Sequence, residues 1–293
     1  MIRSPRQRET SPPRAPHRAV HRARSRRAVP VVLTIAGSDN SGGAGLQADL
    51  KTFTTLGVYG TSAVTCVVAE HPGRVLNITP LPAARVADQI RLVLEAFPVA
   101  AIKTGMLYSA EIIAAVGHAI APALKRGVPL VIDPVMVASS GKVLLKKDAI
   151  GALRRLISRA DLVTPNRDEA ALLWGRPIAN LADLEQAARE LNLQFNGPAF
   201  LVKGGHLRTN RAVDILASSN GKLRRYEAKR IPNADPHGTG CTYSAAIAAG
   251  LAHGLPLERA IALGKTFINR ALRTRFEMGG YQLLNHLPPG TPK

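Results

Sequence analysis

The sequence has no apolar run of about 18 residues or more, the length that a membrane-spanning helix needs. It contains only two cysteines, Cys66 and Cys241, which lie far apart and form no CxxC pair. Its eight histidines show no zinc-ligand spacing. These absences argue against a helical membrane protein, a disulfide scaffold and a zinc domain. They favour a globular protein of a reducing, cytoplasmic compartment.

Aromatic residues are also scarce, at 4%, although the hydrophobic fraction of 46% is ordinary for a globular protein. We therefore expect a core built largely from Ala, Val, Leu and Ile. At 293 residues the chain is long enough to bury that core without disulfides or structural metals.

Acidic residues are nearly absent from residues 1–30, which contain nine arginines and one glutamate. Because this segment is rich in proline and has little to bury, we predict a disordered basic extension, followed by a single domain over 31–293. The other 263 residues still carry +11 of the formal charge of +19. A solvated tail is the favoured interpretation; a polyanion-binding arm and an Arg-rich transit peptide are the alternatives. We do not expect nucleic acid to bind except non-specifically, through 1–30; a nucleic-acid-binding protein would show a steep salt dependence that truncation of 1–30 removes.

From Val31 onward, short β-rich apolar runs alternate with segments of helical periodicity. Strands are predicted at 31–37, 58–68, 99–105, 128–133, 161–165, 200–205, 213–218 and 222–228. Helices are predicted at 44–56, from 82, at 109–124, near 148–159, and at 167–174, 181–193, 239–253 and 257–276. This alternation predicts an α/β fold with a mostly parallel sheet and helices on both faces. In such folds, ligands bind beyond the carboxyl ends of the strands.

The stretch HGTGC, residues 237–241, brings two glycines and a cysteine to the start of a predicted helix. Three interpretations compete: a reactive thiol, a backbone cradle for an anion, and an ordinary tight turn. Gly238 and Gly240 permit a sharp turn and a close ligand, and the free N–H groups of the helix bind anions. At such a helix start we expect the pKa of the Cys241 thiol to be lowered. A Walker A motif is absent, and Tyr243 occupies the last position of a GxGxxG pattern.

Other polar residues follow the predicted strands. Asp133 ends one of them and suits either magnesium or a catalytic proton, with capping as the alternative. In TPNRDEA, Asn166 and Glu169 are three residues apart and fall on one face of a helical turn, which suits contact with hydrated magnesium. Lys203 ends an apolar strand and offers a point charge to phosphate. The glycine-rich loop in 36–51 leads into a helix that carries Asp49.

Six motifs, in this order, resemble those of the hydroxymethylpyrimidine/phosphomethylpyrimidine kinases of thiamine biosynthesis, members of the ribokinase-like superfamily. The motifs are AGSDNSGGAGLQADLKTF, KTGML, DPVMVASSG, TPNRDEA, LVKGGH and HGTGCTYSAAIAAGLA. The match extends from Val31 to about Arg275. It implies a three-layer α/β/α sandwich. It also implies a kinase that phosphorylates a hydroxymethylpyrimidine and then its monophosphate. ATP and Mg²⁺ are the implied cofactors, a monovalent cation is left open, and a homodimer is the implied assembly.

The resemblance also assigns roles by position. It implies that Gly238, Gly240 and Cys241 form the anion hole, with Cys241 where the hydroxyl proton leaves. Phosphate contacts are implied for Lys203, Thr239 and Asn166, and magnesium-side carboxylates for Asp133 and Glu169. The implied substrate pocket consists of Gly37, Ala44, Asp49, Val68, Glu70 and Met106.

Two stretches depart from the family pattern. Ala69-Glu70-His71-Pro72 replaces the usual Ala-Gln-Asn-Thr, and Asp235-Pro236 replaces an Asn-Thr pair before HGTGC. An ionised glutamate only accepts hydrogen bonds, whereas glutamine also donates them, so Glu70 bears on which ring is bound. A pyridoxal or pyridoxine kinase on the same fold is therefore the alternative. A polyanion-binding protein acting through the basic tail is a third hypothesis.

Overall fold

A computed structural model of the chain describes residues 28–138, 141–205, 207, 210–235 and 237–291. The predicted basic extension therefore lies almost entirely outside the described residues, as does Pro236 of the second departure. No helix among the described residues combines the length and apolarity that crossing a membrane requires.

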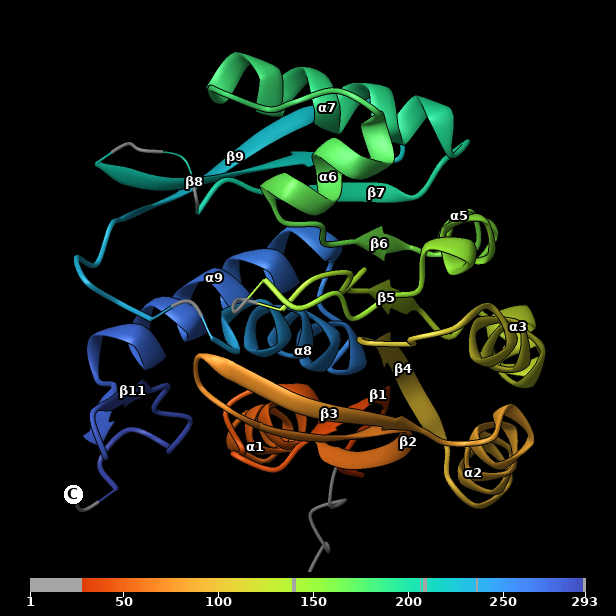
Figure 1. The fold of residues 1–293 in the computed structure, drawn as a ribbon. Helices are drawn as coiled ribbons and strands as arrows, with labels where there is room; N and C mark the ends of the chain where they lie inside the picture. Colours follow the sequence, from red (N-terminus) through yellow and green to blue (C-terminus); the bar gives the residue numbers. More distant parts are fainter. Residues whose placement is uncertain (1–27, 139–140, 206, 208–209, 236, 292–293) are drawn as a thin grey trace, which may run out of the picture.

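Nine strands form one sheet in the order β3-β2-β1-β4-β5-β6-β7-β8-β9 within the described part of the chain (Figure 1). The strands are β1 (Val31–Asp39), β2 (Tyr59–His71), β3 (Arg74–Pro80), β4 (Val99–Thr104), β5 (Leu130–Ile132), β6 (Leu162–Val163), β7 (Ala199–Lys203), β8 (Arg211–Ala217) and β9 (Leu223–Lys229). The six strands from β2 to β7 in this order run parallel, and β3, β8 and β9 pair antiparallel at the two edges. The carboxyl ends of the six parallel strands therefore share one end of the sheet.

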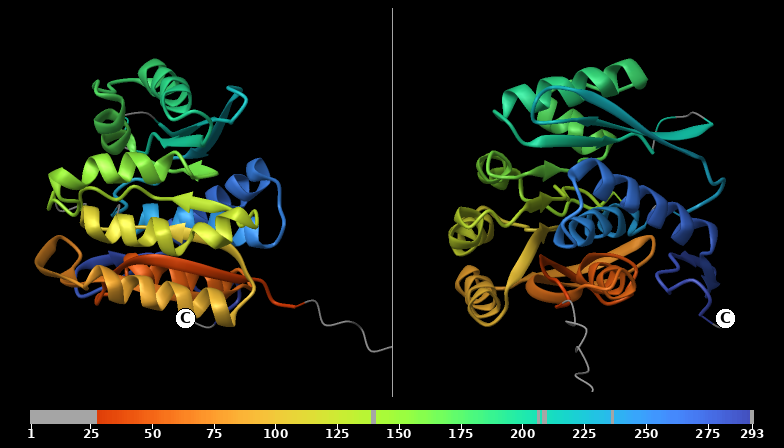
Figure 2. Two further views of the ribbon diagram at one scale, coloured as in Figure 1. Left: turned by 90° about the vertical axis from the view of Figure 1, so that its right-hand side faces the viewer. Right: turned by 180° about the vertical axis from the view of Figure 1, so that it is seen from behind.

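Helices cover both faces of this sheet (Figures 1 and 2). On one face lie α2 (Ala83–Ala96), α3 (Ala110–Ala119), α4 (Ala121–Lys125), α5 (Ile150–Ile157), α6 (Arg167–Trp174) and α7 (Leu181–Gln194). The other face carries α1 (Gly45–Thr55), α8 (Thr239–Ala252) and α9 (Leu257–Arg273). The three-layer α/β/α architecture with a mostly parallel sheet is the predicted one.

The sheet centre is apolar on both sides, as parallel strands between two helix layers require. Along β1, Leu33 packs into the core layer beneath α2, α3, α5 and α7, whereas its neighbour Val32 packs beneath α1, α8 and α9. Both side chains are 0% exposed. The core consists mostly of Ala, Val, Leu and Ile, as the scarcity of aromatic residues predicted.

Four details differ from the predicted elements. The helix predicted at 109–124 is two helices, because Pro122 stands in the first turn of α4 and cannot donate a hydrogen bond to α3. β3 was not predicted, since this edge strand is largely exposed and carries polar residues. β10 (Phe276–Met278) and β11 (Tyr281–Leu283) form a short hairpin that the sequence pattern also missed. Its first strand occupies the last residue predicted for the final helix, which ends at Arg273.

Removing the Leu33 side chain tests the two-layer core. We expect Leu33→Ala to lower the free energy of unfolding by about 2–5 kcal/mol, because it leaves a cavity in the central strand. Leu92, on α2 and 66% exposed, is the matched control, and Leu92→Ala should change stability little. Urea denaturation followed by circular dichroism measures both; equal losses would contradict this description of the core.

Candidate active site

A cavity of about 830 Å³ opens at the carboxyl ends of the parallel strands, next to the first turn of α8. All but one of the residues predicted for the site line it. The lining includes Gly37, Ala44, Val68, Glu70, Met106, Asp133, Asn166, Glu169, Lys203, Gly238, Thr239, Gly240 and Cys241. Segments that are more than 200 residues apart in sequence, such as those of Gly37 and Cys241, thus meet around one space.

The two glycine-rich segments touch at the backbone. Gly238, the N-cap of α8, has φ +74°, a conformation that side chains with a Cβ rarely adopt. A Cβ on Gly238 would lie 1.9 Å from the carbonyl oxygen of Gly43, and one on Gly43 would lie 2.8 Å from Cδ2 of His237. Neither distance leaves room for a methyl group, so these glycines allow the loop before α1 and the turn before α8 to come together.

Asp39, at the end of β1, joins the same two segments. Its carboxylate accepts hydrogen bonds from the backbone N–H groups of Ser41 and Ala44, both at 2.7 Å, and Nε2 of His237 lies 3.1 Å away. Burial alone would raise the pKa of Asp39, but these contacts, led by that with His237, lower it to about 2. Burial likewise opposes the charged form of His237, yet Asp39 raises the pKa of this histidine. Asp39 and His237 thus form a largely buried pair in the cavity lining that connects the two segments.

Asp133, which follows β5, and Lys203, which ends β7, form an ion pair of 2.9 Å on the cavity floor. Asp133 also accepts hydrogen bonds from the hydroxyls of Thr164, at 3.0 Å, and Ser244, at 3.3 Å. Although burial favours its neutral form, Lys203 and then Lys103 hold the pKa of Asp133 below its usual value. A lysine ammonium and a carboxylate thus remain charged beside the N-terminus of α8.

Asn166 and Glu169 have a structural part as well as a place in the cavity wall. The Asn166 side chain accepts from the N–H of Glu169, and Glu169 accepts from the N–H of Asn166 at 2.8 Å, which makes a capping box at the start of α6. Burial, reinforced by the charge of Asp133, raises the pKa of Glu169 to about 7. A cation between the carboxylates of Asp133 and Glu169 would reduce the repulsion between them.

Cys241 lies in the first turn of α8 and is a free cysteine, partly exposed to the cavity. The prediction of a lowered thiol pKa is wrong. Burial of the sulfur raises the pKa of Cys241 to about 12, against the opposing effects of the Lys103 charge and a hydrogen bond from the Gly45 N–H. Asp133 adds to the rise, because two negative charges close together are unfavourable.

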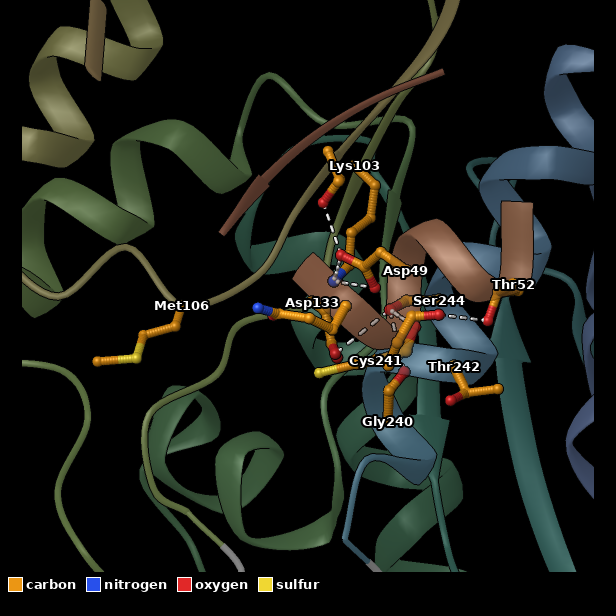
Figure 3. Close-up of polar contacts among 12 residues, drawn as sticks. Asp49, Thr52, Lys103, Met106, Asp133, Gly240, Cys241, Thr242 and Ser244 are labelled. Carbon is orange, nitrogen blue, oxygen red and sulfur yellow. Dashed lines mark hydrogen bonds and ion pairs between the residues drawn. The ribbon is translucent and has the colours of Figure 1, made fainter. Parts of the chain in front are cut away.

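Asp49 is the predicted substrate residue that does not line the cavity. It is 0% exposed and accepts hydrogen bonds from Lys103, at 2.8 and 3.0 Å, and from the Thr34 hydroxyl, at 2.6 Å. Figure 3 shows this pair beside Asp133 and Cys241. Although burial disfavours the ammonium, the charge of Asp49 raises the pKa of Lys103. Asp49 therefore supports the site from within the protein instead of facing the cavity.

A further buried ion pair was missed by sequence reasoning. Lys265 on α9 donates to Asp214 on β8 at 2.6 Å and to the carbonyl oxygen of Ala212 at 3.1 Å, and all three residues line the cavity. In the sequence, Lys265 looks like the polar face of an amphipathic helix. Asp214 inside the apolar run VDILAS is the only signal that could have drawn attention to the pair.

The sequence pattern of the phosphomethylpyrimidine kinase family matches residues 39–285. The chain belongs to this family. It is 44% identical over 258 residues to the thiamine biosynthesis bifunctional protein ThiED of Geobacter sulfurreducens, which covers 87% of this chain and 52%, about half, of that protein. It is 45% identical over 255 residues to the hydroxymethylpyrimidine/phosphomethylpyrimidine kinase of Rhizobium meliloti, covering 85% of this chain and 93% of that one.

Among solved structures, the pyridoxal kinase of Bacillus subtilis, determined as an ADP complex, matches with a TM-score of 0.80 at 34% identity. The match covers 88% of this chain and 98% of that one. The predicted ribokinase-like fold and the predicted kinase class are therefore confirmed. The chain thus has the sequence pattern of the phosphomethylpyrimidine kinases, and its fold is similar to that of a pyridoxal kinase.

A methyl group at Gly238 should separate the two glycine-rich segments. We expect Gly238→Ala to lower kcat about 100-fold, because the added methyl group displaces the turn, and a displacement of about 1 Å can cost that much. Gly151→Ala on α5, where a Cβ has space, is the control and should leave kcat unchanged. Steady-state kinetics and melting temperatures measure both variants. A Gly238→Ala enzyme with normal kcat would show that the contact does not position the site.

Proposed function

We propose that this kinase phosphorylates the hydroxymethyl group of 4-amino-5-hydroxymethyl-2-methylpyrimidine with ATP, and then its monophosphate to the diphosphate, in thiamine diphosphate biosynthesis. The observation that carries the proposal is the turn Gly238–Cys241 at the N-terminus of α8, opposite the Lys203–Asp133 pair. Free backbone N–H groups, a helix dipole and an ammonium converge there, which suits a transferring phosphoryl group.

Charge neutralisation would do most of the chemistry in this arrangement. A loose phosphoryl-transfer transition state spreads negative charge over the equatorial oxygens, and the α8 N–H groups, Gly240 and Lys203 would stabilise that charge. Thr239 would add a phosphate contact at the same helix start, and Asn166 would lie beside the phosphates. The ADP complex of the Bacillus subtilis relative supports ATP as the phosphoryl donor.

Magnesium fits the acidic side of the cavity through its waters. No group of three or more His, Cys, Asp or Glu able to hold a metal occurs among the described residues. Asp133 and Glu169 are nevertheless two mutually repelling carboxylates on the cavity wall, and Mg²⁺ usually takes only one or two carboxylates while keeping several waters. Asp133 and Glu169 would hold Mg²⁺ through its waters, and the ion would offset part of the phosphate charge.

Cys241 would receive the substrate's hydroxyl proton late, as the new O–P bond forms. With a pKa of about 12, its thiol is protonated at pH 7 in the free protein. Its own proton would therefore have to pass to the solvent first, so that the thiolate is the group that accepts the hydroxyl proton. The proposal therefore assigns it a smaller share of catalysis than the phosphate-binding groups. A monovalent cation in this site stays open.

Replacing Cys241 tests that assignment. We expect Cys241→Ala to lower kcat about 100-fold, the lower end of what a positioned proton acceptor contributes, while the Kd for ATP stays within a factor of two or so. Steady-state kinetics and isothermal titration calorimetry with a non-hydrolysable ATP analogue separate the two quantities. Unchanged turnover would remove Cys241 from proton transfer, whereas an equal loss of ATP affinity would make it a binding residue.

The substrate itself is tested by incubating the protein with ATP and Mg²⁺ and one of three compounds: the hydroxymethylpyrimidine, its monophosphate or pyridoxal. Mass spectrometry follows the products. A pyrimidine diphosphate supports the two-step assignment. Pyridoxal phosphate alone would favour the alternative, for which the similarity to the Bacillus subtilis pyridoxal kinase is the specific observation.

Four further predictions remain part of this proposal. The two free cysteines agree with a reducing, cytoplasmic compartment. A homodimer follows from the family resemblance. The boundary between a basic extension of residues 1–30 and one kinase domain over 31–293 stays a prediction, as does any polyanion binding by the extension.

A further inference from the structure

Glu70 lies at the polar edge of an apolar wall in the cavity. At the end of β2, Val68 and Glu70 both line the cavity, whereas Ala69 between them is exposed. Val68 packs in a small apolar cluster with Cys66 and Met106. Gly37 lies against the same wall, because a Cβ on it would be only 3.2 Å from the Met106 sulfur.

The backbone fixes the position of Glu70. Its N–H donates to Oδ1 of Asn40 at 2.7 Å, which ties the end of β2 to the loop that follows β1. The pairing of β2 with β3 shifts register between Ala69 and Glu70, so that Glu70 pairs with Val75. Such an irregularity re-aims a side chain at the end of a strand. Glu70 is thus held by its main chain, and its carboxyl group is left to meet a ligand.

The carboxyl group of Glu70 has no hydrogen-bond partner or ion pair in the part of the chain that the structure describes. Partial burial, with the charge of Asp39 adding to it, raises the pKa of Glu70 to about 7, although His237 opposes the rise. The other titratable groups that line the cavity near this end of β2 are His71, Arg74 and Asp235. Glu70 can therefore carry a proton near neutral pH, and a protonated carboxyl both donates and accepts hydrogen bonds.

We propose that Glu70 determines ring specificity as a proton-sharing carboxyl group. It accepts a hydrogen bond from an exocyclic amine and shares one proton with the adjacent ring nitrogen of an aminopyrimidine. This inference rests on the function proposed above and adds a residue and a proton to it. A glutamine at this position would present a donor and an acceptor without any proton exchange, whereas Glu70 makes binding depend on a proton from the solvent.

The proton count gives the sign of the pH dependence. The complex contains one proton on the carboxyl–pyrimidine pair, whether it lies on oxygen or on nitrogen. Below about pH 7 the free protein already carries this proton on Glu70, so binding takes up none. Above about pH 7 the free carboxyl is ionised and binding must take up one proton from the solvent. Affinity then falls about tenfold per pH unit.

The test compares KM for the hydroxymethylpyrimidine in the wild-type kinase and in Glu70→Gln from pH 5.5 to about 9, at saturating ATP and Mg²⁺, the upper limit being about two pH units above the titration. The ratio of the two KM values removes any titration of the substrate's own ring, because both enzymes see the same substrate. We expect the KM of the wild type divided by the KM of Glu70→Gln to be constant at acid pH and to rise about tenfold per pH unit above pH 7. The kcat should be less affected than KM. Glu95→Gln, at an exposed position on α2, is the matched control and should follow the wild type.

The outcomes separate the two proposals. A rising KM ratio supports the role of Glu70. A ratio that stays flat while both enzymes form phosphorylated pyrimidine overturns that role and leaves the proposed function intact. A wild-type enzyme that forms no phosphorylated pyrimidine at any pH overturns the proposed function, and the inference about Glu70 falls with it.

Discussion

The contact between the two glycine-rich segments positions the starts of α1 and α8 relative to one another at the carboxyl end of the sheet. Gly43 precedes α1 and Gly238 caps α8, and neither position has room for a Cβ. Asp39 holds the same segments together through Ala44 and His237. Because α1 and α8 both begin at this contact, it sets how far the start of α8 lies from the apolar wall formed by Val68 and Met106. The relative position of these two helix starts thus depends on glycine at both positions.

Two of the ion pairs at the site, both close to Cys241, differ in their access to ligands. Lys103 and Asp49 are fully buried and neutralise one another inside the protein, whereas Lys203 and Asp133 line the cavity. Breaking a buried pair is strongly unfavourable, so the inner pair keeps its charges in place when ligands bind and leave. Cys241 lies beside both pairs, and its thiol remains protonated because burial outweighs the attraction of the nearby ammonium. In the proposed function, the start of α8 and Lys203 therefore bind the phosphate.

Strand-end residues were predictable because the chemistry and the periodicity agree. Asp133 and Lys203 each end a short apolar run, and parallel strands bring such ends together without any knowledge of distances. Ionisation was not predictable in the same way. A helix N-terminus argues for a low thiol pKa at Cys241, but the degree of burial reverses the sign, and burial is a property of the packed molecule. The same holds for Asp49, whose partner Lys103 is 54 residues away.

The sequence by itself determined the alternation of strands and helices, the order of the motifs and the kinase family, because each depends on local periodicity or on residues a few positions apart. Only the tertiary structure decided which polar residues face the cavity. It buries Asp49, exposes Glu70 to the cavity beside the Asp39–His237 pair, and brings Lys265 to Asp214. The Asp49–Lys103 and Lys265–Asp214 pairs join elements that are distant in sequence. Their free energies therefore arise from desolvation and Coulomb terms that exist only once the chain has packed.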